Sequence, residues 1–288
     1  MPGWLEYLLA RAQYLMPGHA ISRLAYRLSR VTTPWIKNPL NRWFVRQFGL
    51  DLSEAEHSDP TAYPSLNALF TRALKPGARP LPDDPRLLVS PADGVLSEFG
   101  TARADRLLQA KGIDYSLQAL LGGDAALSAP FRDGAFATVY LSPRDYHRFH
   151  MPLDGRLTHM IYVPGRLFSV SLMTARHIPG LFARNERVVC LFDTPAGRMA
   201  VVLVGAVNVA AIETVWAGLV TPPPRGDIEV TTYPDGPTLH RGDELGRFNM
   251  GSTVIVLMEK DRLQWLPETR PGMAVRMGQA LGRVSTAP

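Results

Sequence analysis

Three polar side chains from separate motifs are of the types that together perform nucleophilic chemistry. Asp93, His150 and Ser252 lie in the segments Ser90-Pro-Ala-Asp-Gly94, Tyr146-His-Arg-Phe-His150 and Asn249-Met-Gly-Ser-Thr253. A serine nucleophile needs a general base, usually a histidine, and a carboxylate can orient that base. Their order along a chain is free to vary, so this set predicts an orienter, a base and a nucleophile. Because a glycine precedes it, Ser252 can be aimed at the carbonyl group of Gly251.

Each motif also has an ordinary structural interpretation. Gly-Ser and Asp-Gly are common in turns, and His147 and His150 can be structural hydrogen-bonding groups. A metal site at the two histidines is conceivable, but no nearby run of Cys, Asp or Glu completes a coordination sphere, so we expect no metal. The single cysteine, Cys190, lies in the apolar run 187–192. This setting predicts a buried strand in preference to a reactive thiolate, and no disulfide can form within the chain.

The basic residues are concentrated at the N-terminus. Residues 1–50 hold seven Lys or Arg and one acid, a net charge of +6, so the rest of the chain sums to −1 in a total of +5. Apolar residues recur with helical spacing from Trp4 to Leu15 and from Ile21 to Val31, and Asn38-Pro39 suggests the start of a third helix. These amphipathic helices could lie on an anionic membrane or pack on the protein's own core. Nucleic acid is disfavoured, because the arginines alternate with large apolar residues.

The remainder of the chain, residues 51–288, predicts a mainly β body. The whole chain is 46% hydrophobic and 20% charged, which is typical of a globular protein. Short valine-rich runs predict strands over 87–89, 135–141, 157–163, 188–192, 200–204 and 254–258, with helical stretches near 63–74 and 116–121. Residues 199–212 form the longest apolar stretch, which is too short to span a membrane and is expected to be buried sheet. A turn-rich linker is expected over 221–227.

Taken together, the fold class predicted is α+β, with N-terminal amphipathic helices before the β body. The phrases Val89-Ser-Pro-Ala-Asp-Gly-Val95 and His240-Arg-Gly-Asp-Glu-Leu-Gly246 are similar to turns of the sandwiched barrel of biotinyl and lipoyl carrier domains. The carrier lysine is missing, so this likeness predicts barrel-sandwich character and no carrier function.

The chain resembles the phosphatidylserine decarboxylase family over nearly its whole length, including the N-terminal region. Besides the three motifs above, the resemblance rests on Tyr162-Val-Pro-Gly-Arg-Leu-Phe-Ser-Val170, Phe182-Ala-Arg-Asn-Glu-Arg187, Ile212-Glu-Thr-Val-Trp-Ala-Gly218 and Gly246-Arg-Phe-Asn-Met-Gly-Ser-Thr253, in the family's order. The family's cleavage motif is usually Leu-Gly-Ser-Thr or Gly-Gly-Ser-Thr. Here Met250 takes the first position, which leaves the Gly-Ser bond itself unchanged.

The resemblance implies a proenzyme that cuts itself between Gly251 and Ser252. Asp93, His150 and Ser252 match the family's charge-relay triad, and His147 matches a second histidine, either for decarboxylation or for contact with the headgroup phosphate. Attack of Ser252 on Gly251 would give an ester. β-Elimination and loss of ammonia would then leave a covalent pyruvoyl group at residue 252, and chains 1–251 and 252–288.

In the family this pyruvoyl group is the cofactor that forms a Schiff base with phosphatidylserine, which loses carbon dioxide to give phosphatidylethanolamine. The resemblance further implies a heterodimer of the two chains that can dimerise again. It also implies a peripheral position on the cytoplasmic face of the cell membrane, with residues 1–50 as the membrane-associating part. Two other functions are open on the residues alone: a serine hydrolase that uses the same triad on an external ester or peptide, and a noncatalytic lipid-binding protein.

Overall fold

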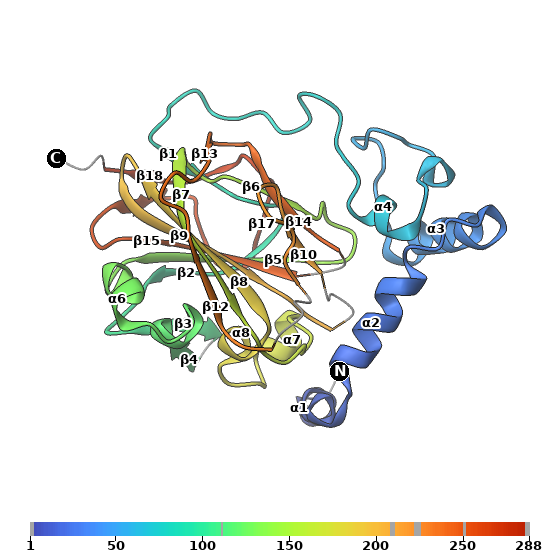
Figure 1. Ribbon diagram of the computed structural model, residues 1–288, viewed down its shortest axis with the longest axis horizontal. Helices are drawn as coiled ribbons and strands as arrows, with labels where there is room; N and C mark the ends of the chain where they lie inside the picture. The colour runs from blue at the N-terminus through green and yellow to red at the C-terminus, as the bar shows by residue number, and fades with distance from the viewer. Residues whose placement is uncertain (1–2, 111, 208–210, 222–225, 250–251, 286–288) are drawn as a thin grey trace.

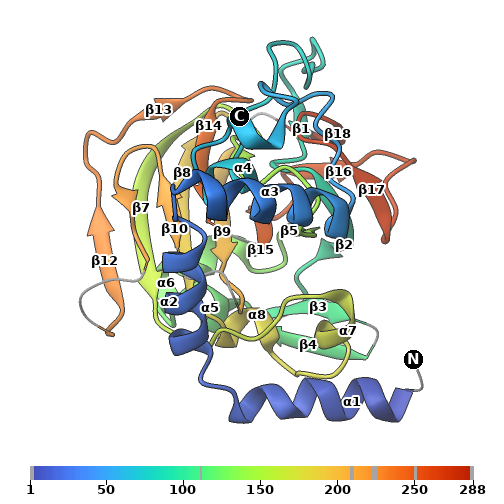
Figure 2. The same cartoon turned by 90° about the vertical axis from the view of Figure 1, so that its right-hand side faces the viewer.

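The N-terminal segment forms a series of helices along one side of a β body. The computed structural model describes residues 3–110, 112–207, 211–221, 226–249 and 252–285 (Figure 1). The series consists of α1 (Gly3–Ala12), the short 3₁₀ helix η1 (Gln13–Leu15), α2 (Gly18–Leu28) and α3 (Pro34–Phe48). Figure 2 shows α1, α2 and α3 following one another across the face of the body. The first two helices lie where the apolar spacing predicts them.

Helix α3 begins five residues before the position that Asn38-Pro39 suggests. Pro34 occupies the first turn, where its fixed φ suits a helix and its missing N–H has no partner to lose. Asn38 does not cap the helix, because it lies inside it. Its side chain accepts a hydrogen bond from Lys37 Nζ at 2.8 Å. Pro39 therefore lies inside the helix, and the predicted start was wrong.

The largest sheet of the body has nine antiparallel strands. Eight of them follow in spatial order, and a ninth, β13 (Thr238–Leu239), also pairs with β7. The order is β12 (Glu229–Thr232), β7 (Gly155–Val163), β8 (Arg187–Thr194), β9 (Gly197–Val204), β15 (Ser252–Met258), β5 (Ala135–Leu141), β2 (Gly94–Thr101) and β17 (Met273–Val275). Each of the six predicted runs lies within a strand, five of them in this sheet.

Smaller sheets and short helices complete the body. A four-stranded sheet is ordered β11 (Gly218–Leu219), β10 (Ile212–Thr214), β14 (Glu244–Phe248) and β6 (Arg148–His150). A three-stranded sheet is ordered β1 (Leu87–Val89), β18 (Ala280–Val284) and β16 (Leu263–Trp265), and β3 (Arg106–Ala110) pairs with β4 (Ile113–Ser116). The helices are η2 (Pro60–Ala62), α4 (Leu66–Phe70), α5 (Leu117–Leu120), α6 (Ala125–Ser128), η3 (Ala129–Phe131), α7 (Leu172–Ala175) and α8 (Leu181–Arg184).

The helix predicted near residues 63–74 is much shorter than expected. Only Leu66–Phe70 are helical, with the Ser65 hydroxyl accepting a hydrogen bond from the Ala68 N–H as an N-cap. Pro64 disfavours helical backbone in the residue before it, which excludes Tyr63 from the helix. The helix predicted near 116–121 is confirmed as α5.

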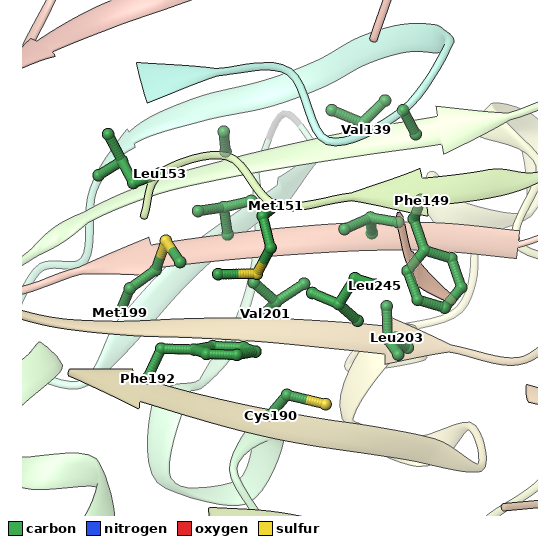
Figure 3. Close-up of a cluster of buried hydrophobic side chains, with 14 of the residues drawn as sticks. Val139, Phe149, Met151, Leu153, Cys190, Phe192, Met199, Val201, Leu203 and Leu245 are labelled. Carbon is green, nitrogen blue, oxygen red and sulfur yellow. The ribbon is translucent and has the colours of Figure 1, made fainter. Parts of the chain in front are cut away.

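Two cores lie on opposite faces of the large sheet. Alternation along β15 assigns Val254 and Val256 to one core and Ile255 and Leu257 to the other. The first core lies between the large and the four-stranded sheets, and Figure 3 shows Phe149, Leu245 and Val201 within it. The second core is covered by α5, α7 and α8 and extends to Ala10 of α1. Two sheets facing each other across one core give the predicted sandwich character, and the α+β class is confirmed.

The two segments that the sequence singled out as a long apolar stretch and a linker are only partly described. Strand β9 covers the first part of 199–212 as buried sheet, whereas 208–210 lie outside the described residues. Residues 222–225 of the predicted linker also lie outside them. In the described part of the chain, no helix is both long and apolar enough to cross a bilayer.

The central strands should carry much of the stability of the fold. Leu203 on β9 is completely buried, whereas Leu108 on β3 is 41% exposed. We expect Leu203→Ala to lower the free energy of unfolding by about 2–5 kcal/mol, because it leaves a cavity in the core. The matched change Leu108→Ala should cost less than about 1 kcal/mol. Equilibrium unfolding in urea measures both, and equal losses would contradict this assignment of the core.

Candidate active site

Two backbone pairings bracket the predicted cleavage bond. Residue 252 begins β15 and pairs with Leu141, the last residue of β5. On the other side, the Phe248 N–H donates to the His147 carbonyl oxygen at 3.0 Å. Segments 141–147 and 248–252 are therefore held side by side at both ends. Met250, Gly251 and the side chain of Ser252 lie outside the described residues.

His147 is a fully buried, neutral imidazole. Its Nδ1 lies 2.9 Å from the Asp145 carbonyl oxygen, which can only accept, so Nδ1 carries the proton. Nε2 is buried and has no hydrogen-bond partner among the described residues. Burial lowers the pKa of His147 to about 3, although the hydrogen bond to Asp145 opposes this shift. The site therefore holds a free basic lone pair at Nε2.

His150 is also buried, but both of its ring nitrogens are engaged. Nδ1 donates to the Gly242 carbonyl oxygen at 2.8 Å, and Nε2 lies 3.0 Å from the Tyr146 hydroxyl. Since Nδ1 carries the proton, Nε2 accepts from Tyr146. Burial lowers the pKa of His150, and the negative charge of Asp93 is a smaller effect in the opposite direction. His150 is thus a neutral base whose lone pair is held by a tyrosine.

Asp93 lies close to His150 without a hydrogen bond to it. Its carboxylate accepts from Arg79 Nε at 2.9 Å, from Arg79 Nη2 at 2.5 Å and from the Met277 N–H at 2.8 Å. The loop that carries Asp93 is nevertheless attached to β6, because the His150 N–H donates to the Pro91 carbonyl oxygen at 2.7 Å. The direct contact between Asp93 and His150 that a charge relay requires stays a prediction.

Gly94 fixes the position of the Asp93 loop against the large sheet. A Cβ atom at residue 94 would lie 2.2 Å from the Tyr140 carbonyl oxygen, and its φ is +157°. Only glycine permits so close an approach of two backbones. The Asp-Gly pair, which the sequence alone explains as a turn, is thus also a packing requirement beside the site.

Asp93 and Tyr146 line a cavity of about 450 Å³ whose rim is rich in arginine. The other charged residues that line it are Asp51, Glu54, Arg72, Arg79, Arg144, Asp145 and Arg276. Arg72 is 4% exposed, and its Nη2 donates to the Arg144 carbonyl oxygen at 3.0 Å. Its Nε and Nη1 have no partner in the described part of the chain, and burial lowers its pKa. Four arginines and four acids line this cavity, so its formal charges balance, and the unpartnered donors of Arg72 are the ones left for a ligand.

Helix α4 contacts the segment that carries the histidines and also the segment that precedes the predicted cleavage bond. The ring centroid of Phe70 lies 3.9 Å from that of His147. Asn67 Nδ2 donates to Asn249 Oδ1 at 2.9 Å, and Arg30 Nη2 donates to the same oxygen at 3.1 Å. Arg30 of the N-terminal segment and Asn67 of α4 thus hold the chain three positions before Ser252.

Sequence reasoning missed several members of this site. Tyr146 lies inside a motif that was recognised, yet its hydrogen bond to His150 depends on the bend before β6. Arg72, Arg79 and Asn67 lie far from the motifs in sequence, and nothing in their spacing points to the site. Cys190 is completely buried in the first core, as Figure 3 shows, and burial raises its thiol pKa. This burial excludes it from the site.

Comparison with known proteins places the chain among carboxy-lyases. A family profile described as Phosphatidylserine decarboxylase matches residues 66–283, and a second, described as PSD, matches residues 8–49. The chain belongs to the phosphatidylserine decarboxylase family, as the sequence motifs predicted.

Relatives described as Phosphatidylserine decarboxylase proenzyme align with nearly the whole chain. The protein of Alkalilimnicola ehrlichii is 59% identical over 255 residues, which cover 88% of each chain. That of a Pseudomonas fluorescens strain is 55% identical and covers 94% of this chain and 95% of its own. That of Halorhodospira halophila is 55% identical and covers 98% of this chain and 96% of its own.

The low pKa of His147 predicts a loss of stability in acid. The folded chain resists protonation of this ring down to about pH 3, whereas an unfolded histidine binds a proton below pH ~6.5. The free energy of unfolding should therefore fall as the pH drops below ~6.5, by up to about 2 kcal/mol at pH ~5 from this group. His147→Asn keeps a donor for the Asp145 carbonyl and cannot titrate, so it should reduce that fall. Urea unfolding at several pH values tests this, and identical pH dependence in both proteins would contradict it.

Proposed function

We propose that the chain cuts itself at Gly251-Ser252 and then performs pyruvoyl-dependent decarboxylation of phosphatidylserine to phosphatidylethanolamine and carbon dioxide. This proposal rests on the backbone pairings on either side of the predicted cleavage bond. The proposal is supported by the pairings of Leu141 with residue 252 and of His147 with Phe248, which hold the two sides of this bond to the segment that carries two buried, neutral histidines. Family membership supplies the substrate class, since the relatives are described as phosphatidylserine decarboxylase proenzymes.

In the proposed self-cleavage, His150 acts as the general base. Its Nε2 takes the proton from Ser252 Oγ in place of the hydrogen bond from Tyr146. The oxygen attacks the Gly251 carbonyl carbon, the C–N bond breaks, and the proton passes to the nitrogen of residue 252, which gives an ester and a free amine. Burial favours this role because it keeps the imidazole unprotonated.

Asp93 would support this step by its negative charge, since its carboxylate makes no hydrogen bond to His150 in the structure. Its carboxylate is held by Arg79 and the Met277 N–H, whereas the Gly242 carbonyl orients the His150 ring. The negative charge nearby favours the imidazolium that forms when His150 takes the proton. We keep Asp93, His150 and Ser252 as the residues of the self-cleaving triad.

The residues present fit a pyruvoyl group at position 252. That group would supply the electron sink that loss of carbon dioxide from an amino acid requires. The orphaned Nε2 of His147 is an unpartnered hydrogen-bond acceptor in a dry setting on the same loop, suited to orient a donor group at the site. We therefore favour a role for His147 in decarboxylation. The phosphate contact suits the arginines of the neighbouring cavity better, since a neutral imidazole offers no charge.

Cleavage would produce chains of residues 1–251 and 252–288 that stay together as a heterodimer, which can dimerise again. Strand β15 of the small chain pairs with β5 and β9 of the large one. Strands β17 and β18 of the small chain pair with β2 and β1. These pairings support an assembly that survives the loss of the peptide bond.

We further propose that residues 1–50 form a membrane-associating part beside a catalytic domain of residues 51–288, peripheral on the cytoplasmic face of the membrane. Large apolar side chains of this segment are exposed to solvent: Trp4, Tyr7, Leu8, Leu9, Leu15, Met16, Leu24, Leu28, Trp35, Ile36, Trp43 and Phe48. The same segment carries a net charge of +6. Exposed aromatic and apolar groups beside arginines suit an interface with anionic lipid.

The decisive test of the proposed function is the mass and N-terminus of the small chain. We expect intact-mass measurement to find fragments 1–251 and 252–288, the latter with a pyruvoyl group in place of a free amine. Ser252→Ala should abolish both cleavage and decarboxylation, since it removes the nucleophile and the source of the pyruvoyl carbonyl. Ser285→Ala changes the other serine of the same fragment and should leave both intact.

A stable, full-length and active chain would refute the self-cleavage and favour a serine hydrolase. Retention of every measurable activity by Ser252→Ala would favour a noncatalytic lipid binder.

Membrane association should depend on the exposed apolar side chains of the N-terminal helices. Trp4, Leu15 and Trp35 are 65%, 90% and 77% exposed, so their replacement by Gln should leave the fold intact. We expect this triple variant to bind anionic liposomes at least about tenfold more weakly, because the lost apolar burial is worth a few kcal/mol. Val215, Leu219 and Val230, also exposed but on the body, provide the matched triple variant, which should co-sediment normally. Equal co-sedimentation of both variants would contradict the membrane assignment.

A further inference from the structure

A second cavity lies where the junction of α1 and α2 meets the body. It has a volume of about 700 Å³ and shares no lining residue with the Asp93 cavity. One part of its lining comes from residues 13–14, 16–20 and Arg23, and the other part comes from residues 165–168 and from Arg184 of α8. A volume of this size is typical of small-molecule sites, which span about 300–1,000 Å³.

The two parts of the lining are fixed to each other by hydrogen bonds. His19 Nε2 lies 3.0 Å from the Gly165 carbonyl oxygen. Arg184 Nη1 donates to the Tyr14 hydroxyl at 3.1 Å, and Arg166 Nη1 lies 3.4 Å from the Tyr14 carbonyl oxygen. The cavity is therefore a built feature of the junction, in which residues far apart in sequence hold one another.

Three arginines line this cavity without an acidic partner. Arg23, Arg166 and Arg184 form no ion pair among the described residues, and no Asp or Glu lines the cavity. The carboxyl group of Glu186, which does not line the cavity, is buried and accepts a hydrogen bond from the Tyr162 hydroxyl at 2.9 Å. The remaining guanidinium donors of Arg166 and Arg184, beyond the contacts to Tyr14, have no protein acceptor in the described residues. The cavity therefore offers a surplus of positive charge and of free donors.

The same cavity has an apolar side. Met16 is 42% exposed, and Leu167, Phe168 and Pro17 complete a hydrocarbon surface next to the arginines. A free inorganic anion would use the guanidinium groups and leave this surface wet. A molecule that carries a phosphate on a hydrocarbon body satisfies both sides, since arginine matches the geometry of phosphate oxygens.

We propose that this cavity binds one glycerophospholipid molecule, with its phosphodiester between Arg23, Arg166 and Arg184 and the start of its acyl chains against Met16 and Phe168. Recognition rests on the phosphodiester and the hydrocarbon, so a serine headgroup is not required. The site goes beyond the proposed decarboxylation and lies outside the catalytic machinery. Because it is formed partly by the α1 and α2 junction, bound lipid would fasten the N-terminal helices to the body.

Isothermal titration calorimetry with dihexanoyl phosphatidylglycerol, kept below its critical micelle concentration, tests the site without a membrane surface. This lipid carries no serine and cannot be decarboxylated. We expect saturable binding to the full chain, at least about tenfold tighter than binding of inorganic phosphate or glycerol 3-phosphate.

Arg23 and Arg27 offer a matched pair of variants. Both are exposed on α2 and each carries one positive charge, but only Arg23 lines the cavity. Arg23→Gln should weaken binding of the lipid about tenfold or more, because it removes a charged hydrogen bond, whereas Arg27→Gln should change it by less than about twofold. Met16→Gln should also weaken binding, while Leu15→Gln, its exposed neighbour outside the cavity, should not.

Several results would overturn the proposal. Equal weakening by Arg23→Gln and Arg27→Gln would show diffuse charge attraction, and equal affinity for phosphate and lipid would show an anion site. Absence of saturable binding would mean that these arginines are simply solvated. Ser252→Ala should bind the lipid as the unchanged chain does. Loss of lipid binding therefore leaves the proposed decarboxylase function untouched, and failure of the mass test leaves this site untouched.

Discussion

The pairing of β15 between β5 and β9 is the constraint on which the rest of the molecule depends. Its residues are paired on both sides without a break from Thr253 to Met258, and its alternating side chains fill both cores. If the chain is cut before residue 252, as proposed, this strand must stay in place afterwards. The central position of β15 in the sheet would keep it there, because both of its edges are hydrogen-bonded to strands of residues 1–251.

Burial of the two histidines follows from the same arrangement. The loop after β5 must return across the sandwich to reach β6, and this path puts His147 against Phe70 and His150 against Tyr146. Burying a titratable ring costs stability unless the ring stays neutral and its N–H finds an acceptor. Backbone carbonyls of Asp145 and Gly242 meet that need, and they also fix which nitrogen keeps its lone pair. Both imidazoles are thereby held neutral, each with its Nδ1 protonated.

Sequence patterns predicted the parts of this molecule that depend on local periodicity. The six strand runs and the first two helices follow directly from the spacing of apolar residues, and the motif order indicated the family. Boundaries that depend on proline were less predictable: Pro34 started α3 early, and Pro64 shortened α4. Long-range polar contacts could not be predicted. The hydrogen bonds of Arg79 to Asp93 and of Tyr146 to His150 depend on the paths of loops, which the local spacing of residues does not predict.

Periodicity left open whether the N-terminal helices contact a membrane or pack on the body of the protein. The structure shows that these two roles need not exclude each other. On α3, Phe44 is buried against Phe70 of α4, while its neighbour Trp43 is 53% exposed. On α2, Leu24 and Leu28 face solvent, while Arg30 just beyond its end reaches Asn249 beside the cleavage segment. Each helix thus has one side committed to the body and another that leaves apolar surface uncovered. This uncovered apolar surface is joined through few contacts to the segment before residue 252, so that the position of the helices and the position of Asn249 cannot vary independently.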